Sequence, residues 1–455
     1  MNLLELPEDL LYLIASYFER DRRTLLALAR ACRDLNMVTR SLLFRHTDDL
    51  SIERIRLLER KINTDATLKA YVHSYPVHME YGVFLDNGLQ KSLGYTNLRE
   101  LAFVSSYKLH LPIDLSLMTR MRRLNVGARG EDQDFQCGFL ETHPFAQIRS
   151  ITLVGNFTAT EIMHFMLIPS IHTLRAKDIG LLRAPKLAAS FATQMSTIIS
   201  LSLVGDGRWS VELKTVQAIF SVCPQLRDLQ CQVPVIASPS GDRIFRKSHV
   251  IGEVNPAALN IAFAPLRARL RRLSLLQYRY DVPYNGTHMD FSRFEELIDL
   301  EITSCCLLPP GAPCEARDEL CGLLPASLRC LKLDFPRESG IFFHHLEGEP
   351  FLAQDPFSIP SARYKWIVEL LRHKRTKYPG LTHINMQDPP GAVGYWHWRQ
   401  VEWAAPTEIC TLLYEVGVTL NVNISYPNPK SEMESWNNPE YKRKIGTWPW
   451  KHECN

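Results

Sequence analysis

One pattern of apolar positions recurs along most of the chain: an apolar residue, two further residues, an apolar residue, one residue and a third apolar residue. The pattern begins at Leu98, Met121, Ile148, Ile171, Ile198, Leu226, Leu270, Leu297, Leu328 and Leu381. Its last two apolar positions are one residue apart, so both point to the same face of a β-strand. The flanking positions are mostly polar or charged, as at Arg123 and Asn125. The pattern therefore predicts ten strands, each buried on one face and solvated on the other.

The spacing of these strands predicts a repeat architecture. Successive starts differ by 23, 27, 23, 27, 28, 44, 27, 31 and 53 residues. Helix-like segments that begin at Thr160, Val211 and Tyr364 lie between strands. A strand and a helix in each repeat of about 20–29 residues are typical of leucine-rich repeats, which this region resembles. The resemblance implies an α/β fold, a horseshoe solenoid with a parallel concave sheet, and the two longest intervals indicate inserted loops.

A different pattern opens the chain. Leu10, Leu11, Ile14 and Phe18 follow one another at helical spacing, and two further apolar sets predict three short helices within residues 6–46. A unit of about 40 residues cannot bury that much apolar surface by itself. Either these helices cap the repeats, or they keep an apolar face for a partner protein, and the pattern alone leaves both possibilities open.

The sequence LPEDLLYLIASYFERDRRTLLALARACRDLNMVTRSLLFRH resembles an F-box, and the whole chain resembles the fungal F-box proteins that carry irregular leucine-rich repeats. The matching residues are Leu6, Pro7, Leu10, Leu11, Ile14, Leu25, Leu26, Cys32, Arg33, Leu43 and Phe44. The resemblance implies a substrate-recognition subunit of a Skp–cullin–F-box ubiquitin ligase, a non-catalytic member of a cullin–RING complex. The Skp-type adaptor would then be bound by Leu6, Pro7, Leu10, Leu11, Ile14, Leu25 and Leu26.

The two patterns together predict the domain organisation. We expect an F-box-like helical domain at 1–46, a linker helix with an atypical first repeat at 47–97, an irregular solenoid at 98–425 with insertions at 234–256 and 336–360, and an irregular C-terminal cap or tail at 426–455. Both insertions are long and rich in turn-forming residues, which is typical of functional loops.

The predicted strands also offer candidate residues for binding an unknown client protein. Arg272, the pair Asp299 and Glu301, and Lys332 lie on successive strands, so they are expected to form a cross-strand charge ladder. Such a ladder either neutralises itself or contacts a client. The aromatic cluster of Tyr395, Trp396 and Trp398 is a second candidate, as a packed rim or as an exposed contact site.

Composition narrows the remaining classes of function. The 455 residues are 45% hydrophobic and 22% charged, with a net charge of +3, which favours neither a nucleic-acid nor a membrane partner. The first ten residues contain acids and no Lys or Arg, unlike a secretory signal, so the eleven cysteines are expected to be reduced thiols in the cytosol or nucleus.

Candidate chemistry is sparse. Cys305, Cys306, Cys314, Cys321 and Cys330 contain no zinc-type C-x-x-C pair, so we interpret them as structural and expect neither a metal nor a cofactor. Walker, dinucleotide-binding, G-x-S-x-G and H-E-x-x-H motifs do not occur, so we expect no enzymatic activity. Two alternatives remain open: a leucine-rich scaffold unrelated to ubiquitin, and an enzyme that uses His344 or His345 in an inserted loop.

Overall fold

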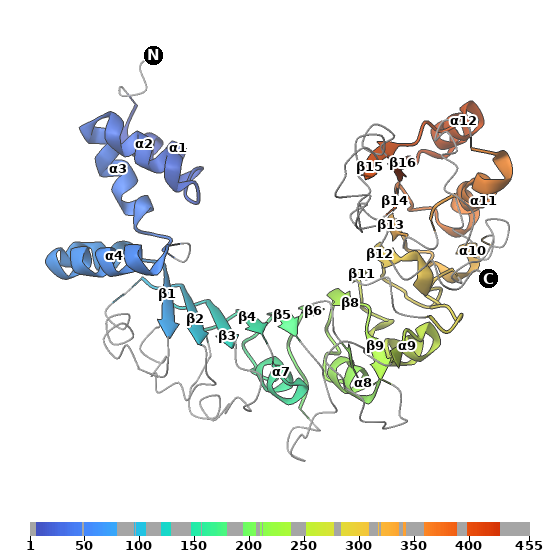
Figure 1. Ribbon diagram of the computed structural model, residues 1–455, viewed down its shortest axis with the longest axis horizontal. Coiled ribbons are helices and arrows are strands. Elements are labelled where there is room, and N and C mark those ends of the chain that lie inside the picture. The colour runs from blue at the N-terminus through green and yellow to red at the C-terminus, as the bar shows by residue number, and fades with distance from the viewer. Residues whose placement is uncertain are drawn as a thin grey trace, which may run out of the picture. The chain divides into compact units, whose positions relative to one another are not determined.

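The structure is a computed structural model of the 455-residue chain (Figure 1). It describes residues 6–47, 50–79, 95, 97–105, 120–128, 147–155, 157–179, 194–205, 210–211, 213–237, 252–276, 284–308, 317, 320–335, 340–342, 359–388 and 398–427. The chain forms two compact units, residues 1–226 and 227–455, so the division falls inside the region predicted to be a solenoid.

Unit 1 begins with the three short helices that the sequence predicts. They are α1 (Glu8–Ser16), α2 (Arg22–Ala31) and α3 (Arg33–Leu43). Pro7 lies immediately before α1, and its carbonyl oxygen accepts hydrogen bonds from the N–H groups of Leu10 and Leu11. The Asp21 side chain caps α2 by accepting from the Thr24 N–H at 3.2 Å. Cys32 is extended, which ends α2 and allows α3 to start in a new direction.

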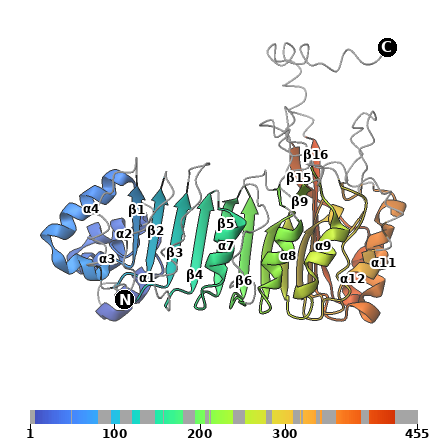
Figure 2. The same cartoon turned by 90° about the horizontal axis from the view of Figure 1, so that it is seen from below.

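Two further helical segments lead into the strands of unit 1. Helix α4 (Ile52–Thr64) and a 3₁₀ helix (Ala66–Tyr71) precede β1 (Ser74–Met79). The remaining strands are β2 (Glu100–Ser105), β3 (Arg123–Ala128), β4 (Ser150–Gly155), β5 (Thr173–Ile179) and β6 (Ser200–Gly205). Figure 2 shows β1 to β6 side by side and pointing the same way, each paired with the strand of the next repeat.

The strands of unit 1 are in register, and this places one row of apolar side chains in the core. Leu101, Leu124, Ile151, Leu174 and Leu201 are aligned across β2 to β6, and each is at most 1% exposed. The structure also describes α7 (Ala159–Met166), β7 (Ser210–Val211) and α8 (Leu213–Ser221) in this unit. Helix α7 begins with a capping box in which Thr158 and Glu161 bond each other's backbone N–H groups.

Unit 2 continues the same arrangement. Its parallel strands are β8 (Asp228–Gln232), β11 (Arg272–Leu276), β12 (Asp299–Thr303), β13 (Cys330–Asp334), β14 (His383–Gln387) and β16 (Thr419–Pro427), paired in this order. Strand β15 (Trp398–Glu402) runs antiparallel beside β16, which the repeat pattern does not predict. A short antiparallel pair, β9 (Val235–Ala237) and β10 (Gly252–Glu253), lies within the predicted first insertion.

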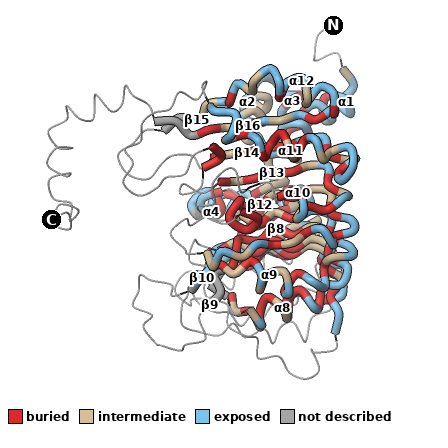
Figure 3. The backbone as a smooth tube through the Cα atoms, turned by 90° about the vertical axis from the view of Figure 1, so that its right-hand side faces the viewer, coloured by how far each residue is buried: buried red, intermediate tan, exposed pale blue. Residues whose placement is uncertain are grey.

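The helices of unit 2 follow its strands in the chain. They are α9 (Pro256–Ala262), α10 (Leu320–Leu323), α11 (Ser361–Lys377) and α12 (Thr407–Val416), with 3₁₀ turns at Ala264–Leu266 and Ser304–Cys306. In Figure 3, buried residues run through β13, β14 and α11. All ten strands predicted from the apolar pattern are present in the two units. Each unit is therefore an α/β solenoid of the leucine-rich-repeat type, with one strand per repeat in a parallel sheet.

A buried arginine secures part of the second insertion. Arg317 is 2% exposed, and its guanidinium donates to the carbonyl oxygens of Ile341 at 2.6 Å and Gly340 at 3.1 Å. The same group lies 5.5 Å from the ring centre of Phe335 and 5.7 Å from that of Trp366. The N–H of Ile341 donates to the buried carboxylate of Asp388 at 3.0 Å. Residues 340–342 are therefore held from both sides of their backbone.

No helix among the described residues combines the length and the apolar character that crossing a lipid bilayer requires.

Candidate protein-interaction surfaces

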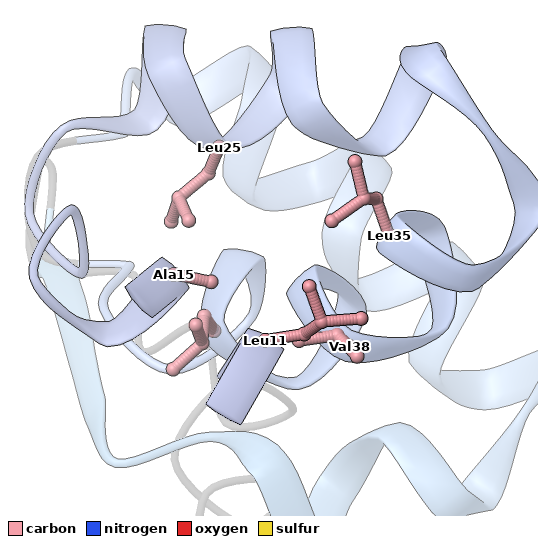
Figure 4. Packing of buried hydrophobic residues seen from close by; sticks show 6 residues of the cluster. Leu11, Ala15, Leu25, Leu35 and Val38 are labelled. Carbon is pink, nitrogen blue, oxygen red and sulfur yellow. The ribbon is translucent and has the colours of Figure 1, made fainter. Parts of the chain in front are cut away.

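The three N-terminal helices have a core of their own. Leu11 and Ala15 of α1 pack with Leu25 of α2 and with Leu35, Val38 and Leu42 of α3. Figure 4 labels the first five of these residues, whose side chains point toward one another. Leu11 and Leu25 are 5% and 1% exposed. Burying a leucine side chain contributes about 1.5–3 kcal/mol relative to leaving it in water, so this small cluster fixes how α1 is rotated about its axis.

The opposite side of α1 carries apolar side chains that remain in solvent. We call Leu10, Leu13, Ile14, Tyr17 and Phe18 the α1 stripe; they are 46%, 53%, 38%, 80% and 38% exposed. Their spacing of three and four residues places Leu10, Leu13, Ile14 and Tyr17 on one side of the helix and its C-terminal turn. A contiguous exposed apolar set of this kind is typical of a protein-binding surface.

The predicted adaptor-binding residues therefore divide into two groups. Pro7, Leu10, Ile14 and Leu26 are exposed, whereas Leu6 is half-buried against the helical core. Leu11 and Leu25 are buried, and the expectation that they contact a partner needs correction: they form the core beneath the exposed surface. Apolar spacing identified the helix but could not determine which of the adjacent residues Leu10 and Leu11 turns inward.

A polar cluster joins the end of α1 to the end of α3. The Glu19 carboxylate lies 2.6 Å from Nε2 of His46 and accepts a hydrogen bond from Arg45 at 3.1 Å, while Arg45 also donates to the hydroxyl of Tyr12. Burial raises the pKa of the Glu19 carboxyl, but the hydrogen bonds from His46 and Arg45 outweigh burial and hold that pKa below its usual value. The cluster keeps the C-terminal turn of α1, including Tyr17 and Phe18, attached to α3.

The same region is connected to the first strand of the repeats. His46 forms a parallel β-bridge with Ser74, the first residue of β1. Thr47 donates from its hydroxyl to the Ser74 carbonyl oxygen at 2.6 Å and from its N–H to the Ser74 hydroxyl at 3.1 Å. Thr47 and Ser74 are both buried, so water does not compete for these bonds.

The predicted charge ladder of unit 2 is present, with one exchanged partner. Arg272 donates to the Asp228 carboxylate at 2.7 and 3.2 Å, although Asp299 is its register neighbour on the other side. Glu301 accepts from the Ser274 hydroxyl at 2.6 Å and from the Lys332 ammonium group. These ion pairs neutralise Arg272, Glu301 and Lys332, three of the four predicted members, which favours self-neutralisation over an open contact strip.

One carboxyl and one thiol beside this ladder have raised pKa values. Burial and the charge of Glu301 raise the pKa of Asp334, against the opposing effect of Lys332. Burial and a hydrogen bond to Asp299 raise the pKa of the Cys330 thiol. Asp299 and Asp334 are thus half-buried on the surface of the sheet, where they lie against neighbouring polar side chains.

The aromatic candidates are only partly described. Tyr395 and Trp396 lie outside the described residues, as do His344, His345 and Cys314. Trp398 begins β15, where it pairs with Pro427 of β16. Among the described residues, no three His, Cys, Asp or Glu side chains come close enough together to hold a metal ion.

A further set of residues was not singled out by the sequence. The position immediately before the strand is basic at β1 to β5, and we call His73, Arg99, Arg122, Arg149 and His172 the basic row. The signal was present in the repeat pattern, because its second position holds Arg at Arg99, Arg122 and Arg149. The apolar positions and the strand flanks that define the predicted strands do not include this position.

No protein-family model matches the chain. No curated protein matches it either. Among solved structures, the chain is similar to the leucine-rich repeat domain of the type III effector XopL, at 13% identity and a TM-score of 0.28, with 73% of this chain and 91% of that domain covered. A TM-score of 0.28 does not establish a shared fold. The assignment of the repeat type therefore depends on the strand order and register given above.

Proposed function

We propose that this chain is the substrate-recognition subunit of a Skp–cullin–F-box ubiquitin ligase. Helices α1 to α3 bind a Skp-type adaptor, and through it the cullin–RING ligase, while the repeats bind a client protein. The observation that carries the proposal is the α1 stripe, which stays exposed although the three helices have a packed core of their own.

The energetics favour a partner for this surface. Burial of an apolar side chain from water contributes roughly 1.5–3 kcal/mol when it is complete. The five side chains of the α1 stripe and Leu26 on α2 are each at least 38% exposed, so they keep a large part of that free energy available. An adaptor that covers the stripe gains this free energy without unfolding the three-helix core.

The F-box resemblance supplies the identity of the partner. The exposed residues Pro7, Leu10, Ile14 and Leu26 belong to the motif positions that match that family. In this role the chain performs no chemistry and needs neither a metal nor a cofactor. It acts in the cytosol or the nucleus, without a nucleic-acid or membrane partner.

A binding experiment with the purified full-length chain and a purified Skp-type adaptor tests the proposal. We expect the double substitution Leu10→Asp and Ile14→Asp to weaken adaptor binding at least 100-fold, measured by isothermal titration calorimetry. The matched control is Tyr414→Asp together with Ile261→Asp, because these residues are 90% and 63% exposed and lie on α12 and α9. The control should bind like the unmodified chain.

Two results would overturn the proposal: absence of adaptor binding by the unmodified chain, or equal binding by the stripe variant. Either result would favour the alternative function, an interaction scaffold with no link to ubiquitin, in which the repeats bind proteins and the helices serve another purpose. Circular dichroism of each variant establishes that it is folded before binding is compared.

A further inference from the structure

Strand β15 is the last strand of the sheet in unit 2 (Figure 1). It pairs with β16 on one side, and within the described residues no strand pairs with its other side. A strand at the edge of a sheet keeps one row of backbone N–H and C=O groups that can pair with another chain. The outer edge of β15 can therefore accept an extended peptide.

The register determines which residues of β15 face outward. Trp403 directly follows β15, and its N–H donates to the Val422 carbonyl oxygen of β16 at 2.8 Å. In an antiparallel pair, residues that bond the neighbouring strand alternate with residues that do not. Val401 therefore faces β16, whereas Gln400 and Glu402 direct their N–H and C=O groups away from it. Among the described residues, these outward groups have no backbone partner.

The outward-facing residues are accessible to a partner. Gln400 and Glu402 are exposed, and Val401 between them is half-buried beside Ile424. The side chain of Gln400 donates from Nε2 to the Asp388 carbonyl oxygen at 3.0 Å, so it is held against the sheet and away from the edge. A strand that joined β15 would place alternate side chains beside the exposed residues and beside Val401.

The exposed face of β15 carries a carboxylate without an ion pair. Glu402 pairs with no Lys, Arg or His side chain among the described residues, and its register neighbour on β16 is the neutral Asn423. Cross-strand pairs of opposite charge stabilise a sheet, and like charges destabilise it. The edge therefore favours a basic residue opposite Glu402 and an apolar residue opposite Val401.

The first strand of unit 1 shows how this chain obstructs a sheet edge. The N–H of Ser74 in β1 donates to the Arg45 carbonyl oxygen at 3.0 Å, and the Ser74 carbonyl oxygen accepts from the Thr47 hydroxyl at 2.6 Å. Pro76 lies two residues further along the same edge and has no N–H to donate. Strand β15 contains no proline. The outward edge of β15 thus keeps the donors that β1 lacks.

We propose that β15 binds an extended segment of a client protein as an additional strand. The segment alternates basic and apolar residues, with Lys or Arg opposite Glu402 and an apolar side chain opposite Val401. The outward groups of Gln400 and Glu402 are two residues apart, and an extended peptide repeats its own groups at the same interval of about 6.8 Å. In strand addition, main-chain hydrogen bonds supply affinity and alternate side chains supply specificity.

The inference rests on the proposed function in so far as it names the partner a client, but peptide binding itself does not require the adaptor. Defined peptides therefore test it with the purified full-length chain. The probe is a fluorescein-labelled peptide, Ser-Lys-Val-Lys-Val-Lys-Val-Lys-Ser, and the control probe holds Glu at the Lys positions. Binding is measured by fluorescence polarisation at 150 mM salt. We expect the basic peptide to bind at least tenfold more tightly than the acidic peptide.

Backbone methylation tests whether the main chain is recognised. Two versions of the basic peptide carry N-methyl groups, one at its lysines and the other at its valines. Each version lacks the N–H donors of one edge of the extended peptide, because donors alternate between the two edges. A peptide added to β15 uses one edge only. One version should therefore bind at least tenfold more weakly, and the other should bind like the unmodified peptide.

Substitutions in β15 locate the binding. Gln400→Pro removes an outward N–H and leaves the bonds to β16 in place, so it should weaken binding of the basic peptide at least tenfold. Gln400→Ala is the matched control: it removes the side chain that bonds Asp388 but keeps the N–H, and should bind like the unmodified chain. Glu402→Lys should reverse the preference, so that the acidic peptide binds more tightly. This variant leaves the backbone unchanged and tests the inference if Gln400→Pro does not fold.

Several results would overturn the inference: absence of binding by the basic peptide, equal binding by the two methylated versions, equal loss in both Gln400 variants, or an unchanged preference in Glu402→Lys. If a second copy or another part of this chain occupies the edge, the amides of Gln400 and Glu402 exchange slowly with deuterium before any peptide is added, and that result also overturns it. Adaptor binding is measured on the same preparation. A chain that binds the adaptor but not the peptides contradicts only this inference, and the reverse contradicts only the ligase role.

Discussion

Nε2 of His46 lies 2.6 Å from Oε1 of Glu19, which precedes it by 27 residues. This pair connects the turn after α1 to the segment that bridges to β1. Rotation and position of the α1 stripe therefore depend on a polar contact as well as on the apolar core.

The Glu19 contact predicts a pH-dependent stability. Glu19→Gln should lower the free energy of unfolding by about 1 kcal/mol at pH 7, a small figure because the side chain is 30% exposed and partly screened by solvent. The folded pKa of Glu19 is below its ordinary value of 4.5, so its stabilising effect is complete above that pH and is lost as the pH falls through the folded pKa. Urea unfolding followed by circular dichroism at pH 7 and pH 3.5 measures the difference, which should shrink at the lower pH.

The control for this experiment is Glu369→Gln on α11, because Glu369 pairs with Arg372, whose side chain is 59% exposed. Its effect should stay within about 0.5 kcal/mol at either pH. A Glu19→Gln difference that is as large at pH 3.5 as at pH 7 would contradict the role of the ionised carboxylate.

The buried and exposed leucines of α1 and α2 should respond differently to truncation. Leu25→Ala is expected to destabilise the three helices by about 2–5 kcal/mol, because it leaves a cavity in their core. Leu10→Ala should cost less than about 1 kcal/mol, because the side chain is already 46% exposed. Hydrogen exchange of the α2 and α3 amides in the full-length chain reads out the difference. Similar exchange in the two variants would contradict the inward and outward assignment.

Arg317 should be essential for unit 2. Arg317→Met removes both donors to the carbonyl oxygens of Gly340 and Ile341, and we expect a loss of about 3 kcal/mol from hydrogen bonds that involve a charged group. Arg317→Lys should restore little, because one ammonium group does not reproduce the planar fork between Phe335 and Trp366. Urea unfolding followed by tryptophan fluorescence measures both variants. Arg372→Met serves as the exposed control, and an equal loss in that variant would refute the assignment.

The strands of this fold were predictable and their side-chain partners were not. Alternation of apolar and polar residues places Leu273 and Leu300 inward because a strand has two faces. The choice of Arg272 between Asp228 and Asp299 depends on side-chain rotamers, and both neighbours have the correct charge and register. The apolar pattern gives no information on that choice.

The helices show a similar limit. Helical spacing predicts that α1 is amphipathic, but Leu10 and Leu11 both lie within its wide apolar arc. Only the packing of α2 and α3 against α1 decides that Leu11 is buried. The buried role of Arg317 was also hidden, because its partners are backbone carbonyls of residues 23 and 24 positions away. Every residue type has a backbone carbonyl, so the amino-acid sequence does not indicate which carbonyls the arginine contacts.

The register of the strands in unit 2 does not depend on the length of the chain that connects them. Asp228 pairs in step with Arg272, and Cys330 pairs in step with His383, across separations of 44 and 53 residues. Each strand is aligned by its neighbour and not by the connection that leads to it. A foreign domain spliced into either connection outside its packed helices and its hydrogen-bonded segments would consequently leave the strands aligned, which suits such stretches to grafting when the chain is engineered.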